Sequence, residues 1–304
     1  MPRPGSDAHN AAVAFTQVEH RRRTIDAIMP STSQPPASPE CRTAEHVPPV
    51  ASGRRRFLTL GASLPLAACS SLQTTAPEPP PPVPGRSIPP FSINPPGDVV
   101  PAGWRTWTLH RTKRPTRYQL VSDGGTTILQ ADADRSASGL ITRVSVDLAP
   151  ETTLSWRWRV RSLIDDADPT ISARDDAPVR IALAFEGDHS RLSVRDRMFA
   201  ERVKLLAGHE LPYATLMYIW TNAAPVGAQL PNQHTGRIRK LVVDSGSTDL
   251  GQWREHRRSV EADFRTVFGE APGRLVAVAL MTDTDNTGTQ ARGYYGDIIL
   301  ANAR

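Results

Sequence analysis

The stretch that decides the fold is LSWRWRV, residues 154–160, because apolar and polar side chains alternate along it without exception. Side chains of an extended strand point alternately to opposite faces, so the pattern predicts a β-strand with one buried and one water-facing side. The buried set is Leu154, Trp156, Trp158 and Val160, and the water-facing set is Ser155, Arg157 and Arg159. One wet face is typical of antiparallel sheets, so both tryptophans are expected in a core.

Further runs of strand-forming residues follow at intervals along the chain. They are VRIALAF (179–185), YATLMYIW (213–220), RIRKLVVDSG (237–246), RLVAVALMTD (274–283) and YYGDIILA (294–301). Helical spacing of apolar residues appears in two places, 192–207 and 255–268. Many strands, few helices and no regular alternation of the two favour an all-β fold, namely an antiparallel β-sandwich or jelly roll with two accessory helices.

Upstream of these strands, the segment SGRRRFLTLGASLPLAACSS (52–71) combines three arginines, a weakly apolar run and a small-residue cleavage pattern. It resembles a twin-arginine export signal followed by a lipoprotein cleavage site, with Arg54, Arg55 and Arg56 in the first motif and Cys69 ending the second. The resemblance implies export to the periplasmic face of a bacterial cell envelope. It also implies a lipid on Cys69 that anchors the protein in a membrane.

The chain divides into four parts on composition. Residues 1–50 carry no hydrophobic period and are interpreted either as a disordered extension or as the result of a mis-chosen start codon. Residues 51–69 form the signal, and residues 70–98, with 10 Pro in 29 positions, are expected to be an extended tether without a core. Residues 99–304 are long enough for one β-sandwich domain.

Charge and cysteine content exclude several classes of function. The chain has 36 Lys and Arg against 31 Asp and Glu, but residues 1–69 hold 8 arginines and 5 acids, so 28 basic and 26 acidic residues remain. Such a balance predicts no nucleic-acid partner. Both cysteines, Cys41 and Cys69, precede the domain. A cysteine nucleophile, a thiolate zinc site and an intramolecular disulfide are therefore excluded for residues 99–304.

Five segments carry a resemblance to a known bacterial family. They are LSWRWRV, DDAPVRIALAF (175–185), LMYIWTN (216–222), MTDTDNTG (281–288) and YYGDI (294–298). In this order and rough spacing they resemble the family called domain of unknown function 3047, over about residues 104–300. The resemblance implies an exported β-rich domain similar to a carbohydrate-binding or jelly-roll sandwich. It implies no catalytic residues.

A polar loop between two apolar runs, MTDTDNTGTQARGYYGDI (281–298), is the main candidate for a binding site. It is not an EF-hand, because Thr287 and Tyr294 stand where that loop needs a ligand and a bidentate Glu. Turn chemistry is favoured, and Ca²⁺ or another polar ligand is the alternative. The candidate ligand-binding residues are Asp176, Arg180, Trp220, Asp283, Asp285, Asn286 and Tyr295, with Asp283 and Asp285 as the ligands if the site takes Ca²⁺.

We expect residues from other segments of the chain to lie close to this loop. If functional, the loop should lie near Asp176 or Tyr295, and Arg180 is expected to pair with Asp176 and so fix the Asp175–Asp176 loop. The acids at Asp165, Asp166 and Asp168 are interpreted as a solvated turn, and His234 as a loop histidine. In the Tyr294–Tyr295 pair, one ring should be buried and the other could line a groove.

No catalytic residue is assigned. The domain contains neither a G-x-S-x-G motif nor an H-E-x-x-H motif, and no glycine-rich phosphate loop opens a helix. The favoured hypothesis is a non-catalytic envelope lipoprotein whose β-sandwich binds a glycan or another envelope protein. The alternative is a carboxylate-dependent glycan hydrolase of the cell envelope, which would need two suitably spaced acids.

Overall fold

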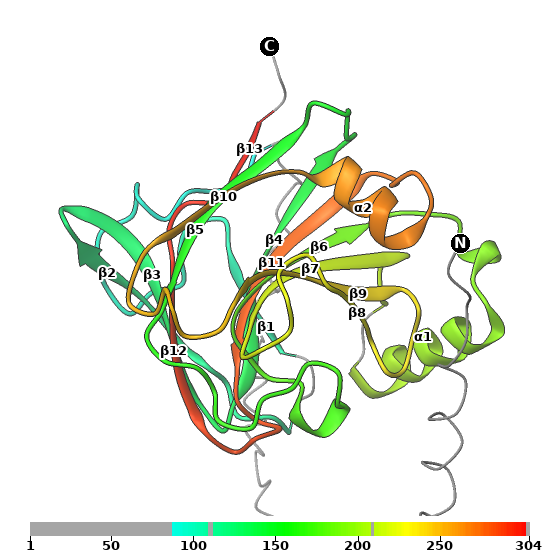
Figure 1. Cartoon of the computed structure of the whole chain (residues 1–304). Coiled ribbons are helices and arrows are strands. Elements are labelled where there is room, and N and C mark those ends of the chain that lie inside the picture. Colours follow the sequence, from blue (N-terminus) through cyan, green and yellow to red (C-terminus); the bar gives the residue numbers. More distant parts are fainter. Residues whose placement is uncertain (1–86, 109–111, 208–209, 302–304) are drawn as a thin grey trace, which may run out of the picture. The chain divides into compact units, whose positions relative to one another are not determined.

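The computed structural model describes residues 87–108, 112–207 and 210–301, which build two packed β-sheets (Figure 1). The first sheet has the strand order β1-β4-β11-β6-β7-β9-β8. Its strands are β1 (Arg105–Thr108), β4 (Ala137–Val146), β11 (Leu275–Asp283), β6 (Ala177–Phe185), β7 (Ala214–Thr221), β9 (Ile238–Ser245) and β8 (Gln229–Pro231).

The second sheet has the order β10-β5-β12-β3-β2, with β13 paired to β5 as well. Its strands are β10 (Arg254–Ser259), β5 (Thr153–Val160), β12 (Gln290–Tyr295), β3 (Thr126–Asp134), β2 (Arg117–Asp123) and β13 (Ile299–Ala301). All strand pairs in both sheets are antiparallel except β7 with β9. The predicted antiparallel β-sandwich is therefore confirmed, with one parallel pair that the sequence pattern did not indicate.

The core lies between the sheets and contains the residues that the alternating stretch predicts. Trp156 and Trp158 on β5 are buried, whereas Arg157 and Arg159 face outward. Trp156 stacks on Tyr218 of β7, with ring centroids 4.9 Å apart and an interplanar angle of 18°. Because β5 and β7 belong to different sheets, this stack ties the two layers together.

Two helices accompany the sheets: α1 (Val194–Ala207) and α2 (Val260–Phe268). In addition, Ser172–Arg174 and His189–Arg191 form single 3₁₀ turns. Figure 1 shows α1 near β8 and β9, on the side away from β2, β3 and β12. No helix in the described part of the chain is long and apolar enough to cross a membrane.

The helix predicted over 255–268 is wrong in its first half. Arg254–Ser259 forms β10, which pairs with β5, and the helix begins only after Ser259, whose side chain accepts a hydrogen bond from the Ala262 amide. Alternation of exposed and half-buried side chains along REHRRS fits a strand at the sheet edge. The apolar residues of helical spacing, Val260, Phe264 and Val267, all lie in the part that is helical.

The strand predicted over 294–301 is two strands, β12 and β13, which pair with different parts of β5. Between them, the Asp297 carboxylate accepts hydrogen bonds from the Phe91 amide (2.6 Å) and from the Ser92 amide (3.0 Å). Three residues, 296–298, lie opposite two residues of β5, 156–157, so the register shifts by one residue and the strand is interrupted.

The packed domain begins before residue 99, where the tether was expected to end. Ile88 and Phe91 are buried in the core cluster, and Phe91 packs 5.2 Å from the Trp104 ring. The boundary predicted between 98 and 99 is therefore wrong, because apolar residues among the prolines provide packing that composition alone hides. Residues 1–50, the signal with Arg54, Arg55, Arg56 and Cys69, and the tether up to residue 86 lie outside the described residues.

Candidate functional site

The polar loop after β11 meets the start of β6, because the two strands are antiparallel neighbours and Asp283 lies opposite Ala177. This register brings Asp176 and Arg180 to the same end of the sheet as the loop. Asn286 donates to Asp176 Oδ1 from its backbone amide (3.3 Å) and its side chain (3.0 Å). The expectation that the loop lies near Asp176 agrees with this geometry.

Arg180 and Asp283 form a buried, bidentate ion pair at this end of the sandwich. Arg180 Nε lies 2.9 Å from Asp283 Oδ1, and Arg180 Nη2 lies 2.8 Å from Asp283 Oδ2. Burial raises the pKa of Asp283 above the ordinary range, whereas the charge of Arg180 opposes that rise. Burial alone would lower the pKa of Arg180, but the charges of Asp283, Asp175 and Asp176 together outweigh burial and raise the pKa.

The partner predicted for Arg180 was Asp176, and that prediction is wrong. Arg180 contacts Asp283 and Asp175, while Asp176 accepts from the loop instead: its Oδ2 receives the Thr287 amide and hydroxyl, both at 2.7 Å. Sequence proximity favoured Asp176, but the cross-strand register places Asp283 beside the guanidinium. Asp176 thus fixes the loop by hydrogen bonds to its backbone.

A buried lysine completes this cluster and was missed by sequence reasoning. Lys240 on β9 is 1% exposed and donates to the Pro169 carbonyl oxygen at 2.8 Å. It also contacts the Asp175 carboxylate. Burial lowers the pKa of Lys240, although Asp175 opposes that effect. The sequence did carry a signal for this residue. Lys240 stands within the apolar pattern of a predicted strand, and the domain contains few lysines.

The two aromatic candidates in this group do not present a ring face to a ligand. Tyr295 is fully buried; its hydroxyl donates to the Met281 carbonyl oxygen (2.8 Å) and accepts from the Arg180 amide (3.2 Å). Trp220 is also buried and donates Nε1 to the Gly246 carbonyl oxygen at 3.1 Å. Tyr294, the other half of the tyrosine pair, lies on the outer face of β12 and is half-buried.

A cation could be considered among Asp176, Asp283 and Asp285, since one carboxylate oxygen from each lies within 4.8 Å of the others. These carboxylates already have donors, however. Asp283 receives Arg180 and the Ala177 amide, Asp176 receives Asn286 and Thr287, and Asp285 pairs with Lys113. The described donor set therefore fits a structural clasp better than a Ca²⁺ site, which needs six or more free oxygens.

We expect millimolar Ca²⁺ to leave the melting temperature unchanged. A site with a dissociation constant near 0.1 mM would stabilise the protein by about 1.4 kcal/mol at about 1 mM Ca²⁺, an effect that a thermal melt resolves. Calorimetry on the wild type and on Asp285→Ala is the measurement. A calcium-dependent rise in melting temperature that disappears in Asp285→Ala would contradict the structural role of this cluster and support a Ca²⁺ site.

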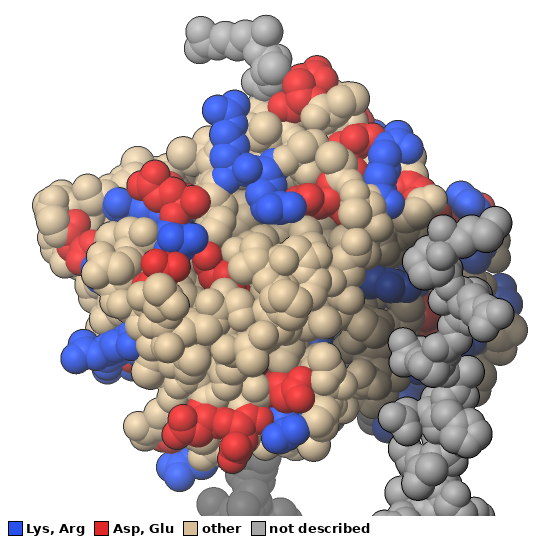
Figure 2. All heavy atoms as spheres, in the orientation of Figure 1, with Lys and Arg blue, Asp and Glu red and all other residues tan. Residues whose placement is uncertain are grey.

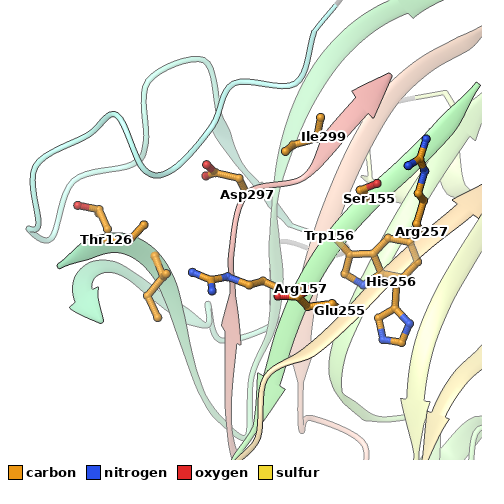
Figure 3. Close-up of a pocket in the computed structure, with 11 residues that line it drawn as sticks. Thr126, Ser155, Trp156, Arg157, Glu255, His256, Arg257, Asp297 and Ile299 are labelled. Carbon is orange, nitrogen blue, oxygen red and sulfur yellow. The ribbon is translucent and has the colours of Figure 1, made fainter. Parts of the chain in front are cut away.

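A groove of about 490 Å³ lies elsewhere, on the outer face of the second sheet. It is lined by Thr126, Thr127, Ile128, Ser155, Trp156, Arg157, Glu255, His256, Arg257, Asp297 and Ile299. Figure 3 shows Arg157 and Trp156 leaving β5 in opposite directions, so Arg157 lies on the groove side and the Trp156 ring on the core side. The groove is assembled from β3, β5, β10 and β13, which are far apart in the sequence.

Four polar side chains in this groove differ from those of the acid cluster because no described residue forms a hydrogen bond or an ion pair with them. Within the described residues, the side chains of Ser155, Arg157, Glu255 and Arg257 have no hydrogen bond or ion pair to another residue. Their pairing across the sheet is regular: Glu255 lies opposite Arg157, and Arg257 lies opposite Ser155. Unpaired donors and acceptors on one concave surface are the groups that a ligand can use.

Aromatic rings border the same face. The Arg157 guanidinium carbon lies 4.6 Å from the Trp253 ring centroid, and that of Arg159 lies 4.6 Å from Trp253 and 4.5 Å from Tyr294. Trp253 donates Nε1 to Asp123 at 2.9 Å, which fixes its ring. Sequence reasoning did not select Trp253 or Arg157, although the shared period of Arg157 and Arg159 already placed them on one wet face.

A separate polar group joins the sheets through the core. Asp244 of β9 accepts from Trp158 Nε1 (2.6 Å), His256 Nε2 (2.7 Å) and Arg254 Nε (3.1 Å). Burial alone would raise the pKa of Asp244, but the hydrogen bonds from His256 and Trp158 outweigh burial and leave the pKa below its ordinary value. Because its donors lie on β5 and β10 of the second sheet, Asp244 of β9 links the two sheets by hydrogen bonds.

The remaining sequence candidates are peripheral. Asp168 accepts from the Thr170 amide at 2.9 Å, as expected of a turn. The exposed His234 stacks on Phe199 of α1 with centroids 5.8 Å apart. Figure 2 shows Lys and Arg interspersed with Asp and Glu over the visible face, in agreement with the near balance of charge.

Comparison with known proteins gives one family. Residues 102–299 match the model described as Protein of unknown function (DUF3047). A comparison with curated proteins gave no match.

Three of the similar solved structures are a glycoside hydrolase domain, a carbohydrate-binding module and a xyloglucanase domain. The glycoside hydrolase domain of Endo-D from Streptococcus pneumoniae R6 is 7% identical, with 66% of this chain and 22% of that chain covered and a TM-score of 0.29. The chain thus spans less than a quarter of that hydrolase. The family 11 carbohydrate-binding module from Clostridium thermocellum is 9% identical (68% and 94% covered, TM-score 0.34). The xyloglucanase domain of NopAA from Sinorhizobium fredii is 8% identical (69% and 99% covered, TM-score 0.35). At these scores the likeness supports no conclusion about activity.

Proposed function

Because the chain belongs to the DUF3047 family of proteins of unknown function, we propose its function from its own surface: a non-catalytic module that binds glycans in the groove across β5 and β10. The observation that carries the proposal is the set of unpaired polar side chains in that groove, Ser155, Arg157, Glu255 and Arg257. Hydroxyl-rich ligands need both donors and acceptors at close spacing, and the four residues supply both.

The size and lining of the groove also suit a sugar. Its volume of about 490 Å³ lies within the usual range of small-molecule sites. The exposed Ile299 adds apolar surface beside the polar groups, and sugar rings carry apolar C–H faces as well as hydroxyls. The polar loop at Asp283 takes no part in this proposal and is assigned a structural role.

Binding is preferred to hydrolysis because the groove offers one free carboxylate and not two. Glycoside hydrolysis needs a protonated and an ionised acid on either side of the bond. Glu255 is unpaired within the described residues, but Asp297 gives both oxygens to Phe91 and Ser92. The hydrolase alternative is tested together with binding.

The test is a glycan-array and hydrolysis screen of the full chain carrying Cys69→Ala. We expect binding without release of reducing ends, and Glu255→Ala should weaken binding by about tenfold, as expected for one charge-assisted hydrogen bond. Glu151→Ala removes an exposed acid from a turn outside the groove and is the matched control. Binding that is equal in all three proteins would reject the groove, and released sugar would favour the hydrolase.

We further propose that the domain is exported and held at the periplasmic face of a bacterial envelope by a lipid on Cys69, as the signal-like segment suggests. Replacing Cys69 with alanine should move the protein from the membrane fraction to the soluble periplasmic fraction. Replacing Arg54, Arg55 and Arg56 with lysines should stop export by the twin-arginine route. An intact peptide across Ala68–Cys69 in membrane-bound wild type, detected by mass spectrometry, would reject lipidation, and unchanged export would point to the general secretory path.

A further inference from the structure

Arg157 is held in a conformation that leaves its hydrogen-bonding edge free. A guanidinium that stacks on an aromatic ring keeps its N–H groups in the plane parallel to the ring, where an acceptor can reach them. The Arg157 guanidinium carbon lies over the Trp253 ring, 4.6 Å from its centroid, and no described residue accepts a hydrogen bond from Arg157. Arg159 provides the contrast, because its Nη2 donates to Asp123 Oδ1 at 3.1 Å. Of the two arginines that share Trp253, Arg157 is the one whose guanidinium donates to no described residue.

Gly296 leaves the space that the Arg157 side chain occupies. A Cβ atom at position 296 would lie 2.6 Å from Arg157 Cγ and 2.7 Å from Nε, so any other residue would displace the arginine. The Gly296 amide also donates to the Arg157 carbonyl oxygen at 2.9 Å, which fixes the two backbones together. Gly296 is therefore a positioning residue for the guanidinium.

A second cation lies beside Arg157 on the neighbouring strand. Arg257 pairs with Ser155, two residues before Arg157, so the two arginines are diagonal neighbours on one face of the sheet. The acids of the groove do not neutralise them directly: Asp297 accepts from Phe91 and Ser92, and no described residue forms an ion pair with Glu255. Two guanidinium groups thus face the groove with their donors unused.

We propose that the groove selects acidic glycans, whose carboxylate groups bind Arg157 in a bidentate manner with Arg257 as the second cation. The inference rests on the proposed glycan-binding function and names its substrate class. Planar guanidinium and planar carboxylate match in geometry, and the ring of Trp253 orients Arg157 before the ligand arrives. Neutral sugars would use the hydroxyl-binding groups only and would bind more weakly.

The experiment compares two forms of one polymer, polygalacturonate and its methyl ester, which differ in charge and share a backbone. Full-length Cys69→Ala protein should bind the acid form about tenfold more tightly than the ester at about 0.15 M salt, and the ratio should fall as salt rises. Arg157→Gln should reduce this ratio to about one. Gly296→Ala should reduce it as well, although it removes no charge. Arg143→Gln, which changes an exposed arginine on β4 that pairs with no described residue, should leave the ratio unchanged.

The outcomes separate this inference from the proposed function. Equal binding of acid and ester, or an acid preference that survives in both Arg157→Gln and Gly296→Ala, overturns the acidic-glycan inference and leaves glycan binding intact. Absence of binding to either polymer and to every array glycan overturns both. If inorganic phosphate at matched ionic strength competes as well as free galacturonate, the groove is a general anion site and the inference fails. Melting temperatures of each variant check that a lost preference does not reflect unfolding.

Discussion

The variant Asp283→Ala is expected to lose about 3 to 5 kcal/mol of unfolding free energy, a large part of the stability of an ordinary domain. The reason is the charge left behind: Arg180 is buried, and its bidentate partner would be gone while Asp175 remains at 3.4 Å. Removing one partner of a buried pair costs more than removing both, because the remaining ion stays desolvated. Urea unfolding followed by tryptophan fluorescence measures the change.

Two controls test that explanation. Asp98→Ala breaks an ion pair with Arg117 in which both side chains are mostly exposed, so it should cost less than about 1 kcal/mol. The double variant Arg180→Met with Asp283→Leu should recover part of the loss, since neither charge remains. If Asp283→Ala were as mild as Asp98→Ala, the buried pair would not be holding this end of the sandwich.

Trp158→Ala should lower the unfolding free energy by a similar amount, about 3 to 5 kcal/mol. The ring is fully buried in the core, and its removal leaves a cavity next to Trp156 and His256. It also removes the 2.6 Å hydrogen bond to Asp244, the residue that links the two sheets. Thermal and urea unfolding should both show the loss.

Trp158→Phe separates the two contributions. Phenylalanine keeps most of the volume but cannot donate, so we expect a loss of about 1.5 to 3 kcal/mol, the range for a hydrogen bond to a charged group. Trp107→Ala, a half-buried tryptophan on the edge strand β1, should cost less than Trp158→Ala. A Trp158→Phe variant as stable as wild type would mean that the bond to Asp244 contributes little.

Much of the fold could be predicted because its central strands are strongly patterned. The alternation of 154–160 and the apolar runs of 179–185 and 274–283 correspond to β5, β6 and β11, which lie in the interior of their sheets. Strands β1 to β4 and β8 were not predicted. Their sequences mix polar and small residues with the apolar ones, which weakens the two-residue period that marks a strand. The helix assigned over 255–268 failed where edge pairing with β5 outweighed local spacing.

The candidate site was predicted in part. The sequence predicted that the loop after β11 lies near Asp176, because acids stand beside both strands. The pairing of Arg180 with Asp283 depends on the strand register, which the sequence does not reveal. The groove could not be predicted, since Thr126, Arg157, Glu255 and Asp297 meet only after β3, β5, β10 and β13 have paired. Single residues on wet faces carry no sign of which strands will become neighbours.

The attachment of the N-terminal segment determines where mechanical load would enter the domain. A pull on the chain before Ile88 would act first on the packing of Phe91 and on the bonds from Phe91 and Ser92 to Asp297. Asp297 also lines the groove, and it follows Gly296, which seats Arg157. If the chain is anchored through Cys69 as we propose, tension along it would reach Asp297 at the groove before it reached the strand ladders. We therefore expect load on such an anchor to disturb the groove before it opens the two sheets.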